Sequence, residues 1–372
     1  MAKPDKNFAR QWGSRASFPK GEQRYFQIIS GEKRGLIAGI ARLILRILSW
    51  VYGLGLGLRR LFYHLGIFRP GMLPAKVISV GNITTGGTGK TPLVEYIARL
   101  AQGYGERPAI LSRGYKGSSA KSGQPWSDEA EVLRENLPQV PLIIDEDRIR
   151  GGRKALDEYD ASLLILDDGF QHWRLVRNLE IVVVDALEPF GYGFLLPRGL
   201  LREPVSALKR ADLLVITRCD LVSRKEVSGI RRRFRGISPG RPVIETQHKP
   251  IEFCDLKNRK LPVEWIKEKR VLGFCGIGNP KGFLVTLKNL KAEVLAFHRF
   301  EDHHRYSLQG LASLADEAKS LGAEALVTTQ KDRANFPQKV DLALPVLVLK
   351  IAIEIISGKG DLEAKLAQLR IR

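Results

Sequence analysis

The segment VGNITTGGTGKTP, residues 80–92, constrains the fold more than any other part of the sequence. It lies between an apolar run typical of a strand, residues 75–80, and one typical of a helix, residues 93–101. A strand, a glycine-rich turn and a helix in that order are typical of a phosphate-binding loop, because backbone N–H groups and the positive end of the helix then face an anion. The usual pattern, Gly-x-x-x-x-Gly-Lys-Ser/Thr, has a glycine where this chain has Thr84.

This loop predicts a nucleotide site. We expect Lys90 to reach the β and γ phosphates and the Thr91 hydroxyl to bind Mg²⁺. A chance glycine-rich loop is the alternative, and the flanking strand and helix argue against it. The residues expected to bind the nucleotide are Thr84, Thr85, Gly86, Gly87, Thr88, Gly89, Lys90 and Thr91.

Short runs rich in Val, Ile and Leu alternate with helical patterns through the rest of the chain. Continuous apolar strands between helices are typical of a parallel sheet covered on both faces, so we predict an α/β fold. Because a Gly- and Pro-rich segment, residues 235–242, separates two groups of strands, we expect a P-loop NTPase-like domain over residues 35–240 and a smaller α/β domain over residues 241–372. The expected strands cover residues 108–111, 140–144, 162–166, 181–184, 212–216, 270–275, 293–299, 324–328 and 345–349.

Residues 35–68 form the most apolar part of the sequence. Arg42 and Arg46 interrupt this segment, and its longest uncharged run, residues 47–58, is shorter than the roughly 20 residues that a bilayer span requires. We therefore expect an amphipathic helix that lies on a membrane surface rather than crossing it. A helix of the domain core is the alternative, and both interpretations can hold for different faces. The preceding residues 1–34 are polar and basic, without the apolar core of a secretory signal, and we expect them to be poorly ordered.

The charge of the chain points to an acidic partner. Lys and Arg number 60 against 40 Asp and Glu, which gives a formal net charge of +20. Nucleic acid, anionic lipid and a phosphorylated substrate all satisfy that charge. The basic run RRRFR, residues 231–235, comes without a nucleic-acid-binding motif, so nucleic acid is not expected. Three widely spaced cysteines indicate neither a disulfide framework nor a zinc site.

The segment LLILDDGFQH, residues 163–172, ends an apolar strand with two carboxylates. P-loop proteins place the acid that holds Mg²⁺ at such a strand end. We expect Asp167 or Asp168 to hold the ion, directly or through water, while the other serves the substrate or the geometry of the site. A turn in which an aspartate caps the next helix is the alternative.

Three further clusters carry polar groups suited to a site. SRGYKG places Arg113 and Tyr115 just beyond a strand, where ligands bind in open α/β sheets. LLREP brings Arg202 and Glu203 together in an expected loop. FEDHHRYS, residues 300–307, groups acids with two histidines, and a solvated polar turn is the alternative for it.

Eight segments, taken in order, resemble the tetraacyldisaccharide 4'-kinase family, the lipid A 4'-kinases of Gram-negative bacteria. The resemblance runs from Gly35 to the mid-330s. The family also has Ser or Thr where the strict loop pattern has glycine, so Thr84 is a family trait. The segments are VGNITTGGTGKTP, SRGYKG, SDEA, DDGFQH, LLPRGLLREP, FCGIGNP, FEDHHRYS and TTQKD.

The resemblance implies transfer of the ATP γ-phosphate to the 4'-hydroxyl of a tetraacylated glucosamine disaccharide 1-phosphate. The expected cofactors are ATP and Mg²⁺, and the expected partners are an anionic glycolipid and the cytoplasmic face of the inner membrane. An anionic lipid substrate agrees with both the basic charge and the amphipathic segment. The resemblance does not identify a protein partner.

The resemblance also implies roles for single residues. Asp128 of SDEA is similar to the acid of the family's Gly-Asp-Glu-Pro and would accept the proton of the sugar hydroxyl, with His303 paired to it. Because His303 falls in the second domain, catalysis would require closure of the two domains. Ser127 and Ala130 depart from the family pattern beside Asp128. The expected catalytic residues are Lys90, Asp128, Arg202 and His303; the metal ligands Thr91, Asp167 and Glu203; and the substrate contacts Arg113, Tyr115, Arg148, Asp168 and Gln171.

Two other functions remain open at this stage. One is a P-loop regulatory switch that binds GTP, and a partner or nucleic acid through its basic faces. Its only support is TRCD, residues 217–220, and RRRFR, and Arg218 stands where the guanine-binding pattern has lysine. A kinase for another glycolipid would share every phosphate-side residue. Nucleotide selectivity tests the first alternative, and acceptor screening tests the second.

Overall fold

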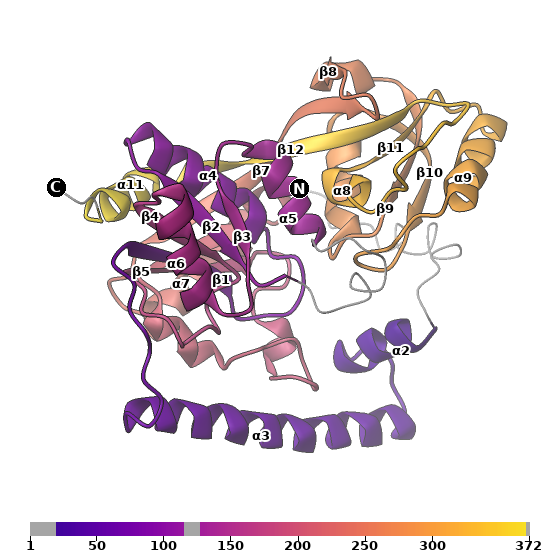
Figure 1. Cartoon of the computed structure of the whole chain (residues 1–372). Helices are drawn as coiled ribbons and strands as arrows, with labels where there is room; N and C mark the ends of the chain where they lie inside the picture. The colour runs from indigo at the N-terminus through magenta and orange to yellow at the C-terminus, as the bar shows by residue number, and fades with distance from the viewer. Residues whose placement is uncertain (1–19, 115–126, 370–372) are drawn as a thin grey trace. The chain divides into compact units, whose positions relative to one another are not determined.

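The computed structural model describes residues 20–114 and 127–369 (Figure 1), so Tyr115 lies outside the described residues. The chain forms two compact units. The P-loop unit comprises residues 28–249 and 352–372, and the small unit comprises residues 1–27 and 250–351. The chain passes between them within two long strands, β7 (Val243–Asp255) and β12 (Val346–Ser357).

A parallel sheet forms the centre of the P-loop unit, in the strand order β7-β6-β5-β1-β4-β2-β3. The strands are almost continuously apolar and buried, as strands covered on both faces must be. This sheet confirms the predicted α/β fold. Its other strands are β1 (Lys76–Asn82), β2 (Pro108–Ser112), β3 (Leu142–Ile144), β4 (Leu163–Asp167), β5 (Leu179–Asp185) and β6 (Leu213–Thr217).

Helices cover both faces of this sheet. One face packs against α4 (Lys90–Gly103), and α11 (Lys359–Ala367) joins the same core through Leu362 and Leu366. The opposite face packs against α7 (Arg224–Ile237) and α6 (Arg148–Tyr159). The tail of the chain therefore completes the core of the P-loop unit, whereas the predicted division at residues 240/241 is a proposal from sequence alone.

The small unit repeats the α/β plan. Its parallel strands lie in the order β10-β9-β11-β12, and a short antiparallel strand, β8, pairs with β7. Apolar clusters fill both faces of this sheet. The elements are β8 (Lys260–Pro262), β9 (Arg270–Cys275), α8 (Pro280–Asn289), β10 (Glu293–Arg299), α9 (Leu308–Ser320), β11 (Ala325–Thr329) and α10 (Gln330–Arg333).

Residues 20–29 correct one expectation. They form helix α2 (Lys20–Ile29), although residues 1–34 were expected to be poorly ordered. The side chain of Ile29 is buried, and its carbonyl oxygen accepts a 2.8 Å hydrogen bond from Arg198 Nη1. A ten-residue helix is marginal by itself in water, so this tertiary packing stabilises α2.

The apolar segment forms one uninterrupted helix, α3 (Leu36–His64), visible along its full length in Figure 1. By length and composition alone it could cross a membrane. Its inward positions recur every three or four residues, and most of the outward side chains are apolar. The inward stripe consists of Ala38, Arg42, Leu45, Ser49, Tyr52, Leu56, Arg59 and Tyr63.

Candidate active site

The phosphate loop joins the end of β1 to the start of α4. Gly86 and Gly89 have φ angles of 103° and 81°, which favour glycine. A Cβ atom at Gly89 would lie 2.8 Å from His248 Nε2, so a side chain does not fit there. Thr84 has an extended backbone, because it forms an antiparallel bridge with Leu201. Its side chain is buried. A glycine at that position is unnecessary in this loop.

Thr217, the last residue of β6, and Arg218, which follows it, hold the phosphate loop in place. Thr217 Oγ1 donates to the Thr88 carbonyl at 2.8 Å, and Arg218 Nη2 donates to the Gly87 carbonyl at 2.8 Å. Arg218 is also paired with Asp185 at the end of β5. Since these bonds use carbonyl oxygens, they leave the N–H groups of the loop available to an anion.

The segment TRCD therefore has a role that sequence reasoning missed. The sequence resembles a variant of a guanine-binding motif, whereas the first two residues of the segment support the phosphate loop. Polar side chains at the end of a buried strand were the available signal. Only the sheet order, which places β6 beside β5 and β5 beside β1, shows where they reach.

Three charged side chains, those of Lys90, Asp168 and Arg202, meet at the mouth of the phosphate loop, where Lys90 begins α4. Asp168 lies between two cations: its Oδ1 is 3.2 Å from Lys90 Nζ and its Oδ2 is 2.8 Å from Arg202 Nη1. Burial acts to raise the pKa of Asp168, but the charges of Lys90 and Arg202 outweigh burial and lower the pKa to about 2. The structure thus brings together three residues that the sequence predicted from separate segments.

The neighbouring Asp167 occupies a different environment. It ends β4, is paired in register with Val80 of β1, and is buried. Burial raises the pKa of its carboxyl to about 6, although the charge of Lys90 opposes this. A buried carboxylate beside a phosphate loop is a suitable ligand for a cation, and Thr91 adds a hydroxyl on the first turn of α4. These oxygen donors fit Mg²⁺.

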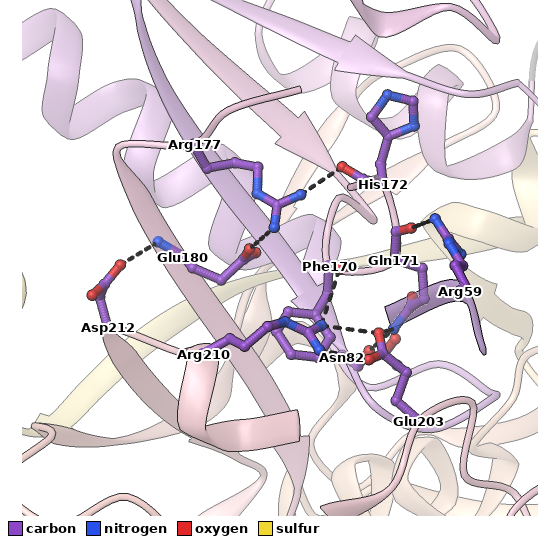
Figure 2. Close-up of polar contacts among 10 residues, drawn as sticks. All are labelled: Arg59, Asn82, Phe170, Gln171, His172, Arg177, Glu180, Glu203, Arg210 and Asp212. Atoms are coloured by element: carbon purple, nitrogen blue, oxygen red, sulfur yellow. Dashed lines mark hydrogen bonds and ion pairs between the residues drawn. The ribbon is translucent and has the colours of Figure 1, made fainter. Parts of the chain in front are cut away.

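Glu203 and Gln171 lie close to Asn82, the last residue of β1, as Figure 2 shows. Glu203 accepts two hydrogen bonds from Arg210, at 2.7 and 3.0 Å, and one from Gln171 Nε2 at 3.2 Å. Gln171 Nε2 also donates to the Asn82 carbonyl at 2.9 Å. Both carboxylate oxygens of Glu203 are therefore engaged within the protein, and its predicted role as a metal ligand stays a prediction.

Two residues were predicted to contact the substrate: Arg113, which follows β2, and Arg148, which begins α6. Arg113 is exposed directly after β2. Arg148 is buried at the start of α6, where Nη1 donates to the Asp145 carbonyl at 2.5 Å. Burial lowers the pKa of Arg148 to about 10, and the charge of Asp167 opposes that shift. The guanidinium of Arg148 therefore lies close enough to the buried Asp167 for the two charges to interact.

Asp128 is the first residue of α5 (Asp128–Asn136) and is buried. Ser127 precedes the helix, and its Oγ accepts a 3.2 Å hydrogen bond from the Ala130 backbone N–H. Ser127, which departs from the family pattern, thus caps the helix that carries the expected base. The positive end of a helix favours a carboxylate at this position.

In the small unit, a buried carboxylate fixes the turn that carries His303. Asp332 accepts hydrogen bonds from the Gly276 N–H at 2.6 Å and from the Tyr306 hydroxyl at 2.8 Å. The His303 N–H donates to the Gly276 carbonyl at 3.1 Å. Three of the family-like segments, FCGIGNP, FEDHHRYS and TTQKD, therefore meet at Asp332. Sequence reasoning assigned no role to this residue.

The parallel sheet, the phosphate loop and the convergence of Lys90, Asp168 and Arg202 define an α/β P-loop enzyme that binds a nucleoside triphosphate. The family model described as "Tetraacyldisaccharide-1-P 4'-kinase" matches residues 41–370. The chain belongs to this family and is an ATP-dependent kinase, which confirms the resemblance inferred from eight segments.

Known relatives agree with this membership. The tetraacyldisaccharide 4'-kinase of Syntrophus aciditrophicus is 38% identical over 84% of this chain and 89% of its own length. That of Halothermothrix orenii is 36% identical over 92% and 96%. The crystal structure of LpxK from Aquifex aeolicus in complex with ATP has a TM-score of 0.66 and 28% identity, and covers 88% of this chain and 99% of that chain.

Proposed function

We propose that this protein transfers the γ-phosphate of ATP to the 4'-hydroxyl of a tetraacyldisaccharide 1-phosphate. The observation that carries this proposal is the convergence of Lys90 and Arg202 on Asp168 at the mouth of the phosphate loop, in a chain of this family. Two cations held at one point neutralise charge on the phosphoryl group as it moves. Charge neutralisation and positioning supply most of the catalysis in phosphoryl transfer.

On the phosphate side of the reaction, each residue has its own role. The loop N–H groups and Lys90 bind the phosphates, and Arg202 faces the transferred group. Thr91 and Asp167 hold Mg²⁺, which when bound supplies further positive charge to the phosphates. Asp168 keeps both cations aligned, since its low pKa keeps it ionised at neutral pH.

The acceptor side rests on the family resemblance. Asp128 accepts the proton of the 4'-hydroxyl, and His303 orients the carboxylate. These residues belong to different units, so the proposal includes a closed state in which the units bring them together. Arg113, Arg148 and Gln171 remain the proposed contacts to the glycolipid, and so does Tyr115, outside the described residues.

We also propose that α3 attaches the enzyme to the cytoplasmic face of the inner membrane. Between Lys33 and Val94 the sequence has nine Lys or Arg and no Asp or Glu. Basic residues beside anionic headgroups contribute about 1 kcal/mol each. The outward face of α3 adds a band of exposed apolar side chains. They are Leu36, Ile37, Ile40, Leu43, Ile44, Ile47, Leu48, Trp50, Val51, Leu54, Leu58, Leu61 and Phe62.

Transfer of labelled γ-phosphate from ATP to tetraacyldisaccharide 1-phosphate in mixed micelles tests the function. The expected product is a labelled bisphosphate. Lys90→Ala, Asp128→Asn and His303→Ala should each lower the rate, and Lys90→Ala and Asp128→Asn should do so by at least about 100-fold. Arg99→Ala, which removes an exposed cation from α4, serves as control and should keep the wild-type rate. Full turnover by Asp128→Asn would refute the assigned base.

A further inference from the structure

Three polar residues of α3 face the phosphate site rather than the solvent. Ser49, Tyr52 and Arg59 lie on the inward stripe of a helix whose other surface is mostly apolar. Each of them bonds a backbone atom of a segment that carries a site residue. Anchoring to a lipid surface requires none of these bonds, because the outward apolar face performs that task.

The first two contacts hold the segment over residues 195–203. The Ser49 hydroxyl oxygen lies 2.8 Å from the Leu195 carbonyl and accepts a 2.9 Å hydrogen bond from the Arg198 N–H. The Tyr52 hydroxyl donates to the Arg202 carbonyl at 2.9 Å. Burial, followed by the charge of Glu203, raises the pKa of Tyr52, so the hydroxyl remains a donor.

The same segment is bonded on its other side to the phosphate loop. The Arg202 N–H donates to the Ile83 carbonyl at 2.7 Å, and the Thr85 N–H donates to the Leu200 carbonyl at 2.8 Å. The segment thus lies between α3 and the start of the loop. The position of the Arg202 side chain, and of Asp168 paired to it, depends on both attachments.

The third contact holds the DDGFQH segment. Arg59 Nη2 donates to the Gln171 carbonyl at 2.8 Å, as Figure 2 shows. The Arg59 Cζ atom lies 5.6 Å from the centroid of the Trp173 ring, in a cation–π contact. Gln171 in turn bonds the Asn82 carbonyl and Glu203. Arg59 is therefore connected to the same strand end that precedes the phosphate loop.

We propose that Tyr52 and Arg59 are positioning residues for phosphoryl transfer, and that α3 holds Arg202 and Asp168 in their working geometry. Their role goes beyond docking the helix. The Tyr52 bond ends on the backbone of Arg202 itself, and the Arg59 bond ends on Gln171, which bonds the Asn82 carbonyl at the start of the phosphate loop. The inference rests on the proposed function only for the identity of the acceptor.

Tyr52→Phe and Arg59→Gln test the proposal in the full-length enzyme. Each should lower kcat about fivefold to tenfold, the effect of one lost hydrogen bond in the transition state. The dissociation constant for ATP should change less than about twofold, since Lys90 and the loop glycines remain. Arg59→Lys, which retains a donor, should recover part of the rate.

Matched controls come from the same helix. Tyr63→Phe removes a hydroxyl from a ring that packs on Trp173, and His64→Gln changes an exposed side chain at the end of the helix; both should keep the wild-type kcat. A double-mutant cycle adds a test that a merely structural role would not pass. In an Arg202→Lys background, Tyr52→Phe should have almost no further effect, because the two act through one contact.

The cycle is measured in two reactions. One is transfer to tetraacyldisaccharide 1-phosphate, and the other is slow hydrolysis of ATP without acceptor, which depends only on the phosphate-side residues. Failure of the wild type in the first reaction alone would refute the acceptor and leave the inference testable in the second. An unchanged kcat, additive effects in the cycle, or equal losses in the two controls would overturn the positioning role.

Discussion

At the scale of single residues, the phosphate site depends on atoms that approach closely. Gly89 combines a positive φ with a contact that excludes a Cβ atom, and His248 supplies that contact. His248 Nε2 is buried and has no hydrogen-bond partner among the described residues. Gly89 therefore leads to a prediction about ATP binding, and His248 leads to one about stability.

Gly89→Ala should weaken ATP binding by at least about tenfold. The new Cβ must displace either His248 or the loop, and the left-handed backbone adds strain of about 1–2 kcal/mol. Gly105→Ala is the matched control, because Gly105 has a similar φ of 82° but open space around it. Calorimetric titration with ATP should show a loss for Gly89→Ala alone. Equal affinity in both variants would contradict the close approach at Gly89.

The stability of the P-loop unit should depend on the charge state of His248. Burial, followed by the charge of Arg218, lowers the pKa of His248 to about 3, from 6.5 in an unfolded chain. The unfolded chain thus binds a proton that the folded chain does not, and stability falls as the pH drops below 6.5. By linkage this residue alone lowers the free energy of unfolding by about 1 kcal/mol at pH 5.5.

Urea unfolding between pH 7.5 and pH 5.5 measures this dependence. His248→Gln should flatten the pH slope by roughly that amount, whereas His64→Gln, at an exposed site on α3, should leave the slope unchanged. Identical slopes for the wild type and His248→Gln would show that the imidazole is not held neutral.

At the scale of elements, α3 is a helix with two chemically different faces. The inward stripe bonds the segments of the phosphate site, and the outward face is apolar. Four glycines interrupt its helical propensity, and they differ in their surroundings: a Cβ atom at Gly53 would lie 3.1 Å from Leu195 Cδ1, while Gly55 and Gly57 have open space.

Gly55→Ala should therefore stabilise α3 by about 1 kcal/mol, the usual difference between the two residues in a helix interior. Gly53→Ala should gain less, because Leu195 must move to accept the methyl group. Thermal unfolding of both variants in one detergent compares them directly. A larger gain for Gly53→Ala would show that α3 does not pack against Leu195 as described.

The same helix shows how far the sequence could be interpreted. Its existence followed from composition, and its orientation did not: Arg42 faces inward and donates to the Lys33 carbonyl at 2.8 Å, while Arg46 is exposed beside Phe194. The phosphate loop and most of the parallel strands were predictable because their signals are local. The support from Thr217 and Arg218 was not, since it joins residues far apart in the chain through the order of strands.

At the scale of the whole molecule, net charge and the apolar face of α3 together predict membrane binding. The protein should sediment with anionic vesicles more than with neutral ones, and salt should weaken the binding because the Debye length shortens to about 3 Å at 1 M. Ile47→Gln with Leu54→Gln should reduce binding to both kinds of vesicle.

Leu308→Gln with Leu321→Gln is the control for that experiment, because these exposed residues begin α9 and directly follow it. It removes a similar pair of apolar side chains from an element outside α3. Equal losses from the two double variants would contradict a membrane face on α3. Equal binding to neutral and anionic vesicles would contradict the electrostatic contribution.

The most direct test of the central claim is the position of the new phosphate. Tetraacyldisaccharide 1-phosphate is incubated with ATP, Mg²⁺ and the enzyme, and the purified product is examined by two-dimensional ¹H–³¹P NMR. The account predicts one new phosphorus signal coupled to the proton at C4', beside the original signal at C1. Coupling to any other sugar proton, or a lipid that stays unmodified while Lys90-dependent ATP binding persists, would contradict it.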